Sequence, residues 1–267
     1  FLRFMCERAP YLMPTVIISD HTFPSLNLQR EVLESAAIEL VEVNPICVTE
    51  DDVIERCGAA DALLVQWAPI TRRVLQSLPH LKGVVRYGIG VNNIDLVAAK
   101  DLGIGIANIP TYCIEEVSNH ALAMILGLGR RIPHDHYRIV HGEWGVGPLL
   151  PIPAFTDMTL GLVGFGTIAR CVAQKARSFG FHIVASDPYV DDARFAEDGV
   201  KRVELDTLLS SADIISLHCP LVEETTHLIN RDTIQKMKKG VILVNTSRGP
   251  LVKESDLAEA LQNEHIV

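Results

Sequence analysis

The stretch Thr159-Leu-Gly-Leu-Val-Gly-Phe-Gly-Thr-Ile-Ala169 decides the fold of the second half of the chain. Its apolar run at 160–163 predicts a short buried strand. Gly164 and Gly166 then predict a tight turn, and the residues from Ile168 onward predict a helix. A strand, a glycine turn and a helix in this order are typical of a parallel α/β fold.

The glycine spacing fits the dinucleotide-binding fingerprint G-x-G-x-x-G/A, with Ala169 in the third position. An ordinary turn between a strand and a helix can have the same spacing, so the interpretation needs a second signal. That signal is Asp187, which follows a predicted strand at 182–186 and lies 187 − 166 = 21 positions after Gly166. An acidic residue about 20 positions on accepts hydrogen bonds from the ribose hydroxyls. The sequence therefore predicts a dinucleotide site. It favours NAD over NADP, because the two residues after Asp187 offer no arginine for a 2′-phosphate.

Composition limits the classes of function. The 267 residues are 48% hydrophobic and 21% charged, which suits a globular chain of two domains. A net charge of −9 argues against nucleic acid as the main partner. The six cysteines are scattered without a C-x-x-C pair, so we expect no metal site and a reducing, cytoplasmic location. No run reaches the roughly 18 apolar residues of a membrane span, and residues 1–12 are expected to be an extension before Met13.

Short apolar runs alternate with amphipathic segments along most of the chain, which predicts parallel sheets covered by helices on both faces. We expect one α/β domain at 13–110 and a second at 111–267. Within the first, a helix is predicted at 28–40, followed by a strand at 41–43. The long segment 113–131 is apolar on most of its surface and predicts a helix buried between domains or in a homodimer.

Further stretches can now be considered with the glycine turn. They are Val85-Arg-Tyr-Gly-Ile-Gly-Val-Asn-Asn-Ile-Asp95, Asp187-Pro-Tyr189, Leu217-His-Cys-Pro-Leu221, Thr225-Thr-His-Leu-Ile-Asn230 and Val244-Asn-Thr-Ser-Arg-Gly-Pro250. Together they resemble the D-isomer-specific 2-hydroxyacid dehydrogenases, the family of phosphoglycerate dehydrogenase, hydroxypyruvate reductase and the C-terminal-binding-protein corepressors. The similarity runs from about Val16 to Val267.

The resemblance implies a flavodoxin-like substrate domain, a Rossmann NAD-binding domain and a substrate cleft between them. It implies hydride transfer between NAD(H) and a D-2-hydroxy acid or its 2-oxo acid, of the phosphoglycerate or the hydroxypyruvate and glyoxylate type. The alternative is an NAD(H)-responsive, corepressor-like scaffold protein with little turnover.

The same resemblance assigns the site residues. Substrate carboxylate binding falls to the loop made of Arg86, Tyr87, Gly88, Ile89, Gly90 and Val91, whose backbone N–H groups would form an anion nest. Arg248 matches the catalytic arginine that grips the carboxylate and the reacting oxygen. Cofactor binding is assigned to Gly164, Gly166, Thr167, Ile168, Asp187, Pro188, His218, Cys219, Pro220, Thr225, Thr246, Ser247 and Arg248.

Two histidines invite a catalytic assignment and are expected to be structural instead. His218 ends a predicted buried strand, and His120 lies inside the apolar helix. In the family, the general acid/base histidine and its glutamate come after the helix matched by 254–263, beyond Val267. A protein ending there is expected to bind the acid better than it converts it. Asn92 stands where several relatives carry Asp, which leaves the substrate preference open.

Overall fold

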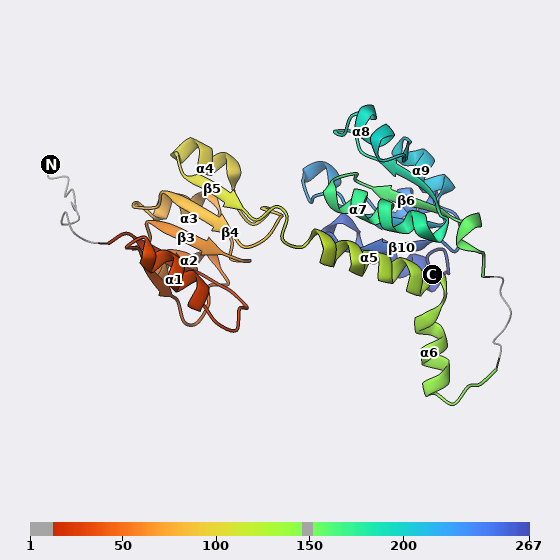
Figure 1. Cartoon of the computed structure of the whole chain (residues 1–267), viewed down its shortest axis with the longest axis horizontal. Coiled ribbons are helices and arrows are strands. Elements are labelled where there is room, and N and C mark those ends of the chain that lie inside the picture. Colours follow the sequence, from red (N-terminus) through yellow and green to blue (C-terminus); the bar gives the residue numbers. More distant parts are fainter. Residues whose placement is uncertain (1–12, 146–151) are drawn as a thin grey trace. The chain divides into compact units, whose positions relative to one another are not determined.

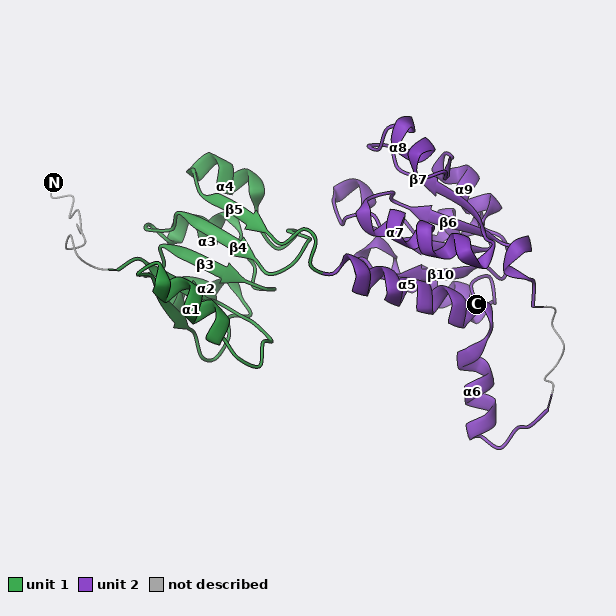
Figure 2. Cartoon of the chain, viewed as in Figure 1, with its two compact units in different colours: residues 1–112 green, residues 113–267 purple. Residues whose placement is uncertain are grey.

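A computed structural model describes residues 13–145 and 152–267 (Figure 1). The expected extension at 1–12 and part of the predicted irregular connector at 145–153 fall outside these residues. The chain divides into two compact units, residues 1–112 and 113–267 (Figure 2). Both are parallel α/β structures, as predicted. No helix among the described residues is both long and apolar enough to cross a membrane.

Unit 1 is built on five parallel strands in the order β2-β1-β3-β4-β5. This is the 2-1-3-4-5 order of flavodoxin-like folds. The strands are β1 (Thr15–Ile18), β2 (Glu39–Glu42), β3 (Ala62–Val65), β4 (Gly83–Arg86) and β5 (Gly105–Asn108). The helices are α1 (Asn27–Ser35), α2 (Glu50–Arg56), α3 (Arg72–Ser77) and α4 (Leu96–Leu102).

The predicted boundary between the first helix and the second strand is wrong. Helix α1 ends at Ser35, and the chain turns through Ala37, which has a φ of 57°. The N–H of Ile38 donates to the Leu33 carbonyl at 2.9 Å, which closes the end of the helix. Residues 39–42 are then free to pair with β1. Pairing with the sheet therefore overrides the helical periodicity that extended the predicted helix to residue 40.

Unit 2 is also a five-stranded parallel sheet, in the order β10-β9-β6-β7-β8. Numbered within the unit, this is the 3-2-1-4-5 order of Rossmann folds. The strands are β6 (Thr159–Val163), β7 (His182–Ser186), β8 (Lys201–Arg202), β9 (Ile214–Leu217) and β10 (Ile242–Asn245). The helices after the first strand are α7 (Thr167–Ala176), α8 (Asp192–Glu197), α9 (Leu205–Ser211), α10 (Arg231–Gln235) and α11 (Glu254–Gln262).

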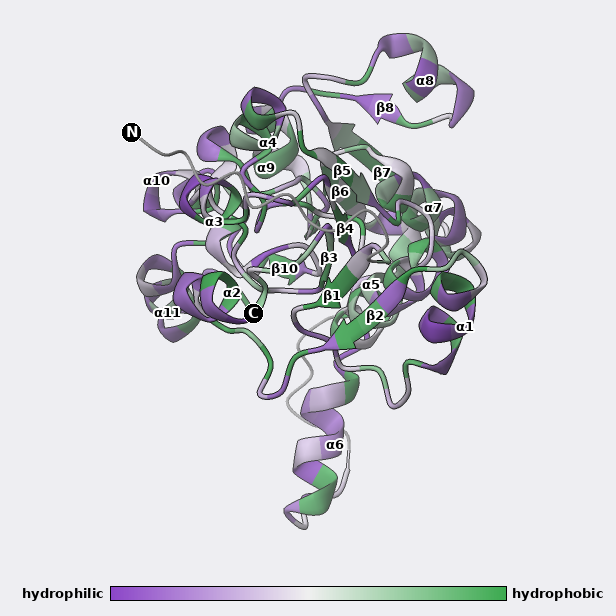
Figure 3. Cartoon of the chain, turned by 90° about the vertical axis from the view of Figure 1, so that its left-hand side faces the viewer, coloured by the Kyte–Doolittle hydropathy of each residue, from purple (hydrophilic) through white to green (hydrophobic). Residues whose placement is uncertain are grey.

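The buried strands of unit 2 form its core because they are apolar on both faces. Leu160, Leu162, Ile214, Ile215 and Leu217 are all fully buried. Figure 3 shows the edge strand β8 in purple, the hydrophilic end of the scale. The two residues of β8 are charged and exposed, so the sequence carried no apolar signal for this strand. Neither β8 nor α8 was predicted.

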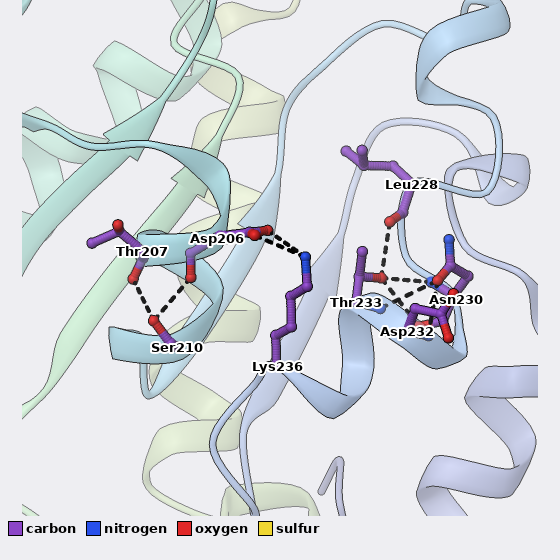
Figure 4. A network of polar contacts seen from close by, with 8 residues as sticks. All are labelled: Asp206, Thr207, Ser210, Leu228, Asn230, Asp232, Thr233 and Lys236. Atoms are coloured by element: carbon purple, nitrogen blue, oxygen red, sulfur yellow. Dashed lines mark hydrogen bonds and ion pairs between the residues drawn. The ribbon is translucent and has the colours of Figure 1, made fainter.

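Side-chain hydrogen bonds fix the helices on the outside of this sheet (Figure 4). Asn230 caps α10, since its side chain accepts from the N–H groups of Asp232 and Thr233 at 3.0 and 3.2 Å. The Thr233 hydroxyl accepts from the Asn230 N–H at 2.8 Å and completes a capping box. The Lys236 ammonium joins α10 to α9 through both carboxylate oxygens of Asp206, at 2.7 and 2.8 Å.

Among the described residues of unit 2, two α-helices precede β6. Helix α5 (Ile114–Gly129) buries Ser118, Ala121, Ile125 and Gly129. Arg131 then adopts a left-handed conformation and α6 (Ile132–Val140) begins with a proline in its first turn, which accounts for the predicted interruption. Helix α6 has no buried residue and extends away from the body of the unit (Figure 1).

Candidate functional site

The glycine turn after β6 has the geometry that its two glycines require. Gly164 has a φ of 88°, and a Cβ there would lie 2.7 Å from the Cys219 nitrogen and 2.8 Å from the His218 carbonyl carbon. A side chain would therefore push the turn away from the end of β9. Gly166 has a φ of −70°, and a Cβ built on it meets nothing within 4 Å. The surface of the second glycine is open to a ligand, while Ala169 is fully buried below it.

Helix α7 begins at this open surface. Its N-cap is Gly166, which offers no side-chain hydrogen bond to the first turn. The N–H groups at the start of the helix and the positive end of the helix dipole therefore remain available to an anion. A pyrophosphate is the group that the fingerprint predicts at this position.

Asp187 lies beside the turn and is held by backbone groups. Its carboxylate accepts the Phe165 N–H at 2.8 Å and the Tyr189 N–H at 2.9 Å. Phe165 is the residue between the two glycines, so the end of β7 is tied directly to the fingerprint. This is the position from which a carboxylate can reach the ribose hydroxyls of a dinucleotide.

One residue near Asp187 was missed. Arg202 of β8 donates to the Asp187 carbonyl at 3.2 Å and to the Asp192 carboxylate at 2.7 Å, and its guanidinium lies 5.5 Å from the centre of the Phe195 ring. The prediction considered only the two residues after Asp187, which offer no arginine. The edge strand brings Arg202 back to the same place.

The ends of β9 and β10 form the other side of the site. The Ser247 hydroxyl donates to the Leu217 carbonyl at 3.0 Å, which ties the two strand ends together. Asn245 shapes the loop that carries Arg248: its side chain accepts the Ser247 N–H at 3.0 Å and donates to the Arg248 carbonyl at 2.9 Å. Asn245 was also missed, because its role depends on the local loop geometry.

A pocket of about 460 Å³ lies between α5 and the end of β10, lined by Glu116, Val117, His120, Met124, Asn245 and Thr246. Among the described residues, the buried Thr246 hydroxyl oxygen has no hydrogen-bond partner. An orphaned polar atom of this kind is costly unless a ligand or water satisfies it. His120 is exposed on α5 and lines this pocket, and its structural role stays a prediction.

His218 behaves as a neutral histidine. Its Nε2 lies 2.9 Å from the Ser216 hydroxyl oxygen. Burial lowers the pKa of His218 to about 4, so the ring carries no charge at neutral pH. Burial also raises the pKa of the neighbouring Cys219 thiol. Thr225 uses its hydroxyl within its own loop, where it accepts the Val222 N–H at 2.9 Å and donates to the Pro220 carbonyl at 2.6 Å.

In unit 1, the predicted carboxylate loop follows β4. The Tyr87 N–H donates to the Val65 carbonyl at 2.8 Å and the Gly88 N–H to the Arg86 carbonyl at 2.9 Å. These two N–H groups are therefore already used, which reduces the predicted anion nest to residues 89–91. Gly88 has a φ of 154°, and the Arg86 guanidinium occupies the space where a Cβ would stand. Glycine is required there, and a cation lies directly beside the loop.

Comparisons with known proteins agree with this geometry. The family model of the D-isomer specific 2-hydroxyacid dehydrogenase NAD binding domain matches residues 122–267. A D-3-phosphoglycerate dehydrogenase of Mycobacterium bovis is 38% identical over 95% of this chain and 47% of its own length. The chain thus spans about half the length of this relative. A hydroxypyruvate reductase of Blautia hydrogenotrophica is 34% identical over 94% of this chain and 79% of its own length.

A solved structure gives the same result. The D-lactate dehydrogenase of Aquifex aeolicus, complexed with NAD and lactic acid, superimposes with a TM-score of 0.82 at 30% identity. The match covers 94% of this chain and 74% of that one.

Proposed function

Since this chain belongs to the D-isomer specific 2-hydroxyacid dehydrogenases, we propose that it serves an NAD-dependent oxidoreductase that interconverts a D-2-hydroxy acid and its 2-oxo acid. The observation that carries the proposal is the meeting of three features at one edge of the second sheet. They are the open backbone at Gly166, the carboxylate of Asp187 and the unpartnered hydroxyl of Thr246.

These features fit NAD. The N–H groups at the start of α7 would hold the pyrophosphate, Asp187 the ribose, and Thr246 a polar group that enters the pocket beside α5. Bound NAD would supply the hydride acceptor of the reaction. His218 is neutral and paired with Ser216, so its part is to shape the end of β9 rather than to exchange protons.

Each unit, taken by itself, contains groups that suit the acid. Residues 89–91 offer backbone N–H groups to the carboxylate, and the Arg86 guanidinium adds a positive charge beside them. Arg248 would bind the carboxylate and the reacting oxygen through two nitrogens and so orient the carbonyl carbon. The fork geometry matters here, because a lysine provides only a point charge.

Substitution of Arg248 tests the proposal in the full-length protein. The assay follows NADH oxidation with hydroxypyruvate, glyoxylate and 3-phosphohydroxypyruvate. We expect Arg248→Ala to lower kcat/KM by about 10²–10³-fold, the scale of a lost transition-state donor, and Arg248→Lys to recover only part of it. Thermal unfolding without ligand serves as the control for folding. No oxidation of NADH with any 2-oxo acid by the wild-type protein would overturn the enzyme assignment.

We also propose a homodimer in the cytoplasm. Helix α6 exposes Ile132, Tyr137, Ile139 and Val140, a larger apolar surface than one isolated helix normally leaves to water. A two-fold interface would bury it. The described cysteines are all free, which supports a reducing compartment. Light scattering should show a dimer at micromolar concentration and a monomer for Ile139→Asp; a wild-type monomer would refute the interface.

A further inference from the structure

Three side chains of unit 2 form a continuous stack from the edge strand β8 to the glycine turn. The Arg202 guanidinium carbon lies 5.5 Å from the centre of the Phe195 ring, within the range of a cation–π contact. The Phe195 and Phe165 rings are stacked, with their centres 4.5 Å apart and their planes at 17°. Both rings are buried, and Phe165 stands between the two glycines of the fingerprint. Direct contacts therefore link a cation on the edge of the sheet to the turn that would hold the pyrophosphate.

Hydrogen bonds connect both ends of this stack to Asp187. At one end, Arg202 donates to the Asp187 carbonyl at 3.2 Å. At the other end, the Phe165 N–H donates to the Asp187 carboxylate at 2.8 Å. The stack and these two hydrogen bonds form a closed ring of contacts. The main chain and the side chain of Asp187 are thus held from opposite ends of the same stack.

The arginine itself is held by its strand and by a second carboxylate. Arg202 pairs with Ala185 of β7, and the Val203 N–H donates to the Ala185 carbonyl at 3.0 Å. The other terminal nitrogen of the guanidinium donates to the Asp192 carboxylate at 2.7 Å. Because the guanidinium is planar and rigid, the two hydrogen bonds and the ring contact together determine its orientation. A lysine offers only a point charge and would not reproduce this set of contacts.

The charges in this region distinguish Arg202 from the neighbouring arginine. The pKa of Arg202 is raised, first by its hydrogen bond to Asp192 and further by nearby carboxylates that include Asp187. Arg194 of α8 instead pairs with Glu197 one turn later on the same helix, at 2.7 Å. Arg202 is thus a cation whose charge faces Asp187, whereas Arg194 is engaged on its own helix.

We propose that Arg202 is a positioning residue for the cofactor: it holds the Asp187 carboxylate toward the ribose hydroxyls and so strengthens the preference for NAD over NADP. The inference rests on the role of Asp187 in the proposed function. Arg202 acts through another residue and not on the reacting atoms. Its effect is therefore expected on the affinity for NAD and not on the chemical step.

The first test measures NAD and NADP affinities by calorimetry in the full-length protein. Arg202→Met keeps an unbranched side chain beside Phe195 but has no donor. We expect its NAD affinity to fall about 3–10-fold, the scale of one hydrogen bond, and its NADP affinity to change less than about 2-fold. Arg202→Lys should remain impaired, because it restores the charge without the planar fork. Arg194→Met is the matched control, since it removes the same charge without a contact to Asp187, and it should leave the ratio of the two affinities unchanged.

A second test asks whether Arg202 acts through Asp187. In an Asp187→Ala background, Arg202→Met should lower NAD affinity by less than about 2-fold, because the carboxylate that it positions is gone. At saturating NADH, kcat and the KM for the 2-oxo acid should be the same in Arg202→Met as in the wild-type protein. Thermal unfolding without ligand checks the fold of each variant.

The outcomes separate this inference from the proposed function. An unchanged NAD affinity in Arg202→Met, or an equal loss with and without the Asp187 carboxylate, would overturn the positioning role. A larger loss of affinity for NADP than for NAD would also overturn it, since the guanidinium would then serve a phosphate directly. Each of these results would leave the dehydrogenase assignment standing. An absence of NAD binding by the wild-type protein, together with an absence of turnover with every 2-oxo acid, would overturn the proposed function itself.

Discussion

Alanine substitution should have a different effect at each of the two glycines of the fingerprint. Gly164 has a φ of 88° and touches the backbone of Cys219. Gly166 has a φ of −70° and open space where a Cβ would stand. Gly164→Ala should therefore damage the fold, whereas Gly166→Ala should spare the fold and damage NAD binding.

The magnitudes follow from these environments. At Gly164, a left-handed alanine costs about 1–2 kcal/mol and the collision with backbone about 1–3 kcal/mol more, so unfolding free energy should fall by about 2–5 kcal/mol. For a unit of this size, that lowers Tm by at least about 4 °C. At Gly166, the loss of a glycine N-cap lowers the free energy of unfolding by about 0.5–1 kcal/mol. The lower entropy of the unfolded chain raises it by about 0.4–1 kcal/mol. The net change in stability is close to zero.

The assays are thermal unfolding without ligand and calorimetric titration with NAD. A methyl group at Gly166 would hold the pyrophosphate away from the helix N–H groups, and losing even one charge-assisted hydrogen bond costs about 1.5–3 kcal/mol. We therefore expect NAD affinity to fall at least about 10-fold in Gly166→Ala at an unchanged Tm. Wild-type NAD affinity in that variant would refute the assignment of the open glycine surface to the cofactor.

Three further predictions concern single side chains. The wild-type protein should bind NAD more tightly than NADP, and Asp187→Ala should narrow that gap in calorimetric titrations; equal affinities at the outset would contradict the ribose role. The pKa of His218 is lowered from 6.5 to about 4, so the unfolded chain binds the proton first as pH falls. Stability should therefore drop between about pH 6.5 and 4 by up to about 1.4 kcal/mol per pH unit, and urea unfolding of His218→Gln should show a flatter pH dependence. Thr246→Val removes an unpartnered buried hydroxyl, so it should keep or raise Tm while weakening NAD binding. If this variant binds NAD as tightly as the wild-type protein, the Thr246 hydroxyl does not contact NAD.

Most of the sheet could be predicted because its strands are short apolar runs between turns. The runs at 160–163 and 214–217 are buried on both faces, as the central strands of a parallel sheet are. The edge strands of the two sheets were harder to predict. Strand β2 was misplaced and β8 was missed, because edge strands expose polar residues and are defined by pairing rather than by hydrophobicity.

The candidate site was only partly predictable for a related reason. The spacing of Gly164, Gly166 and Asp187 follows from the geometry of dinucleotide binding, so these residues can be identified from a single sequence. Arg202, Asn245 and the exposure of His120 depend on contacts between distant segments or on the shape of a loop. The narrowing of the anion nest to residues 89–91 likewise depends on where two N–H groups donate. None of these leaves a periodic or compositional signal.

Each of the two sheets has a switch point in its strand order, and different groups occupy the two switch points. In each sheet the chain reverses direction of growth once, between β1 and β3 in unit 1 and between β6 and β9 in unit 2. Such switch points open a crevice at the carboxyl ends of the strands. In unit 2 the glycine turn leaves backbone exposed there, and an anion can enter. In unit 1 the Asp20 carboxylate fills the corresponding position with its own negative charge and binds the loop across the switch. A carboxylate at this position disfavours a nucleotide phosphate there, because like charges repel.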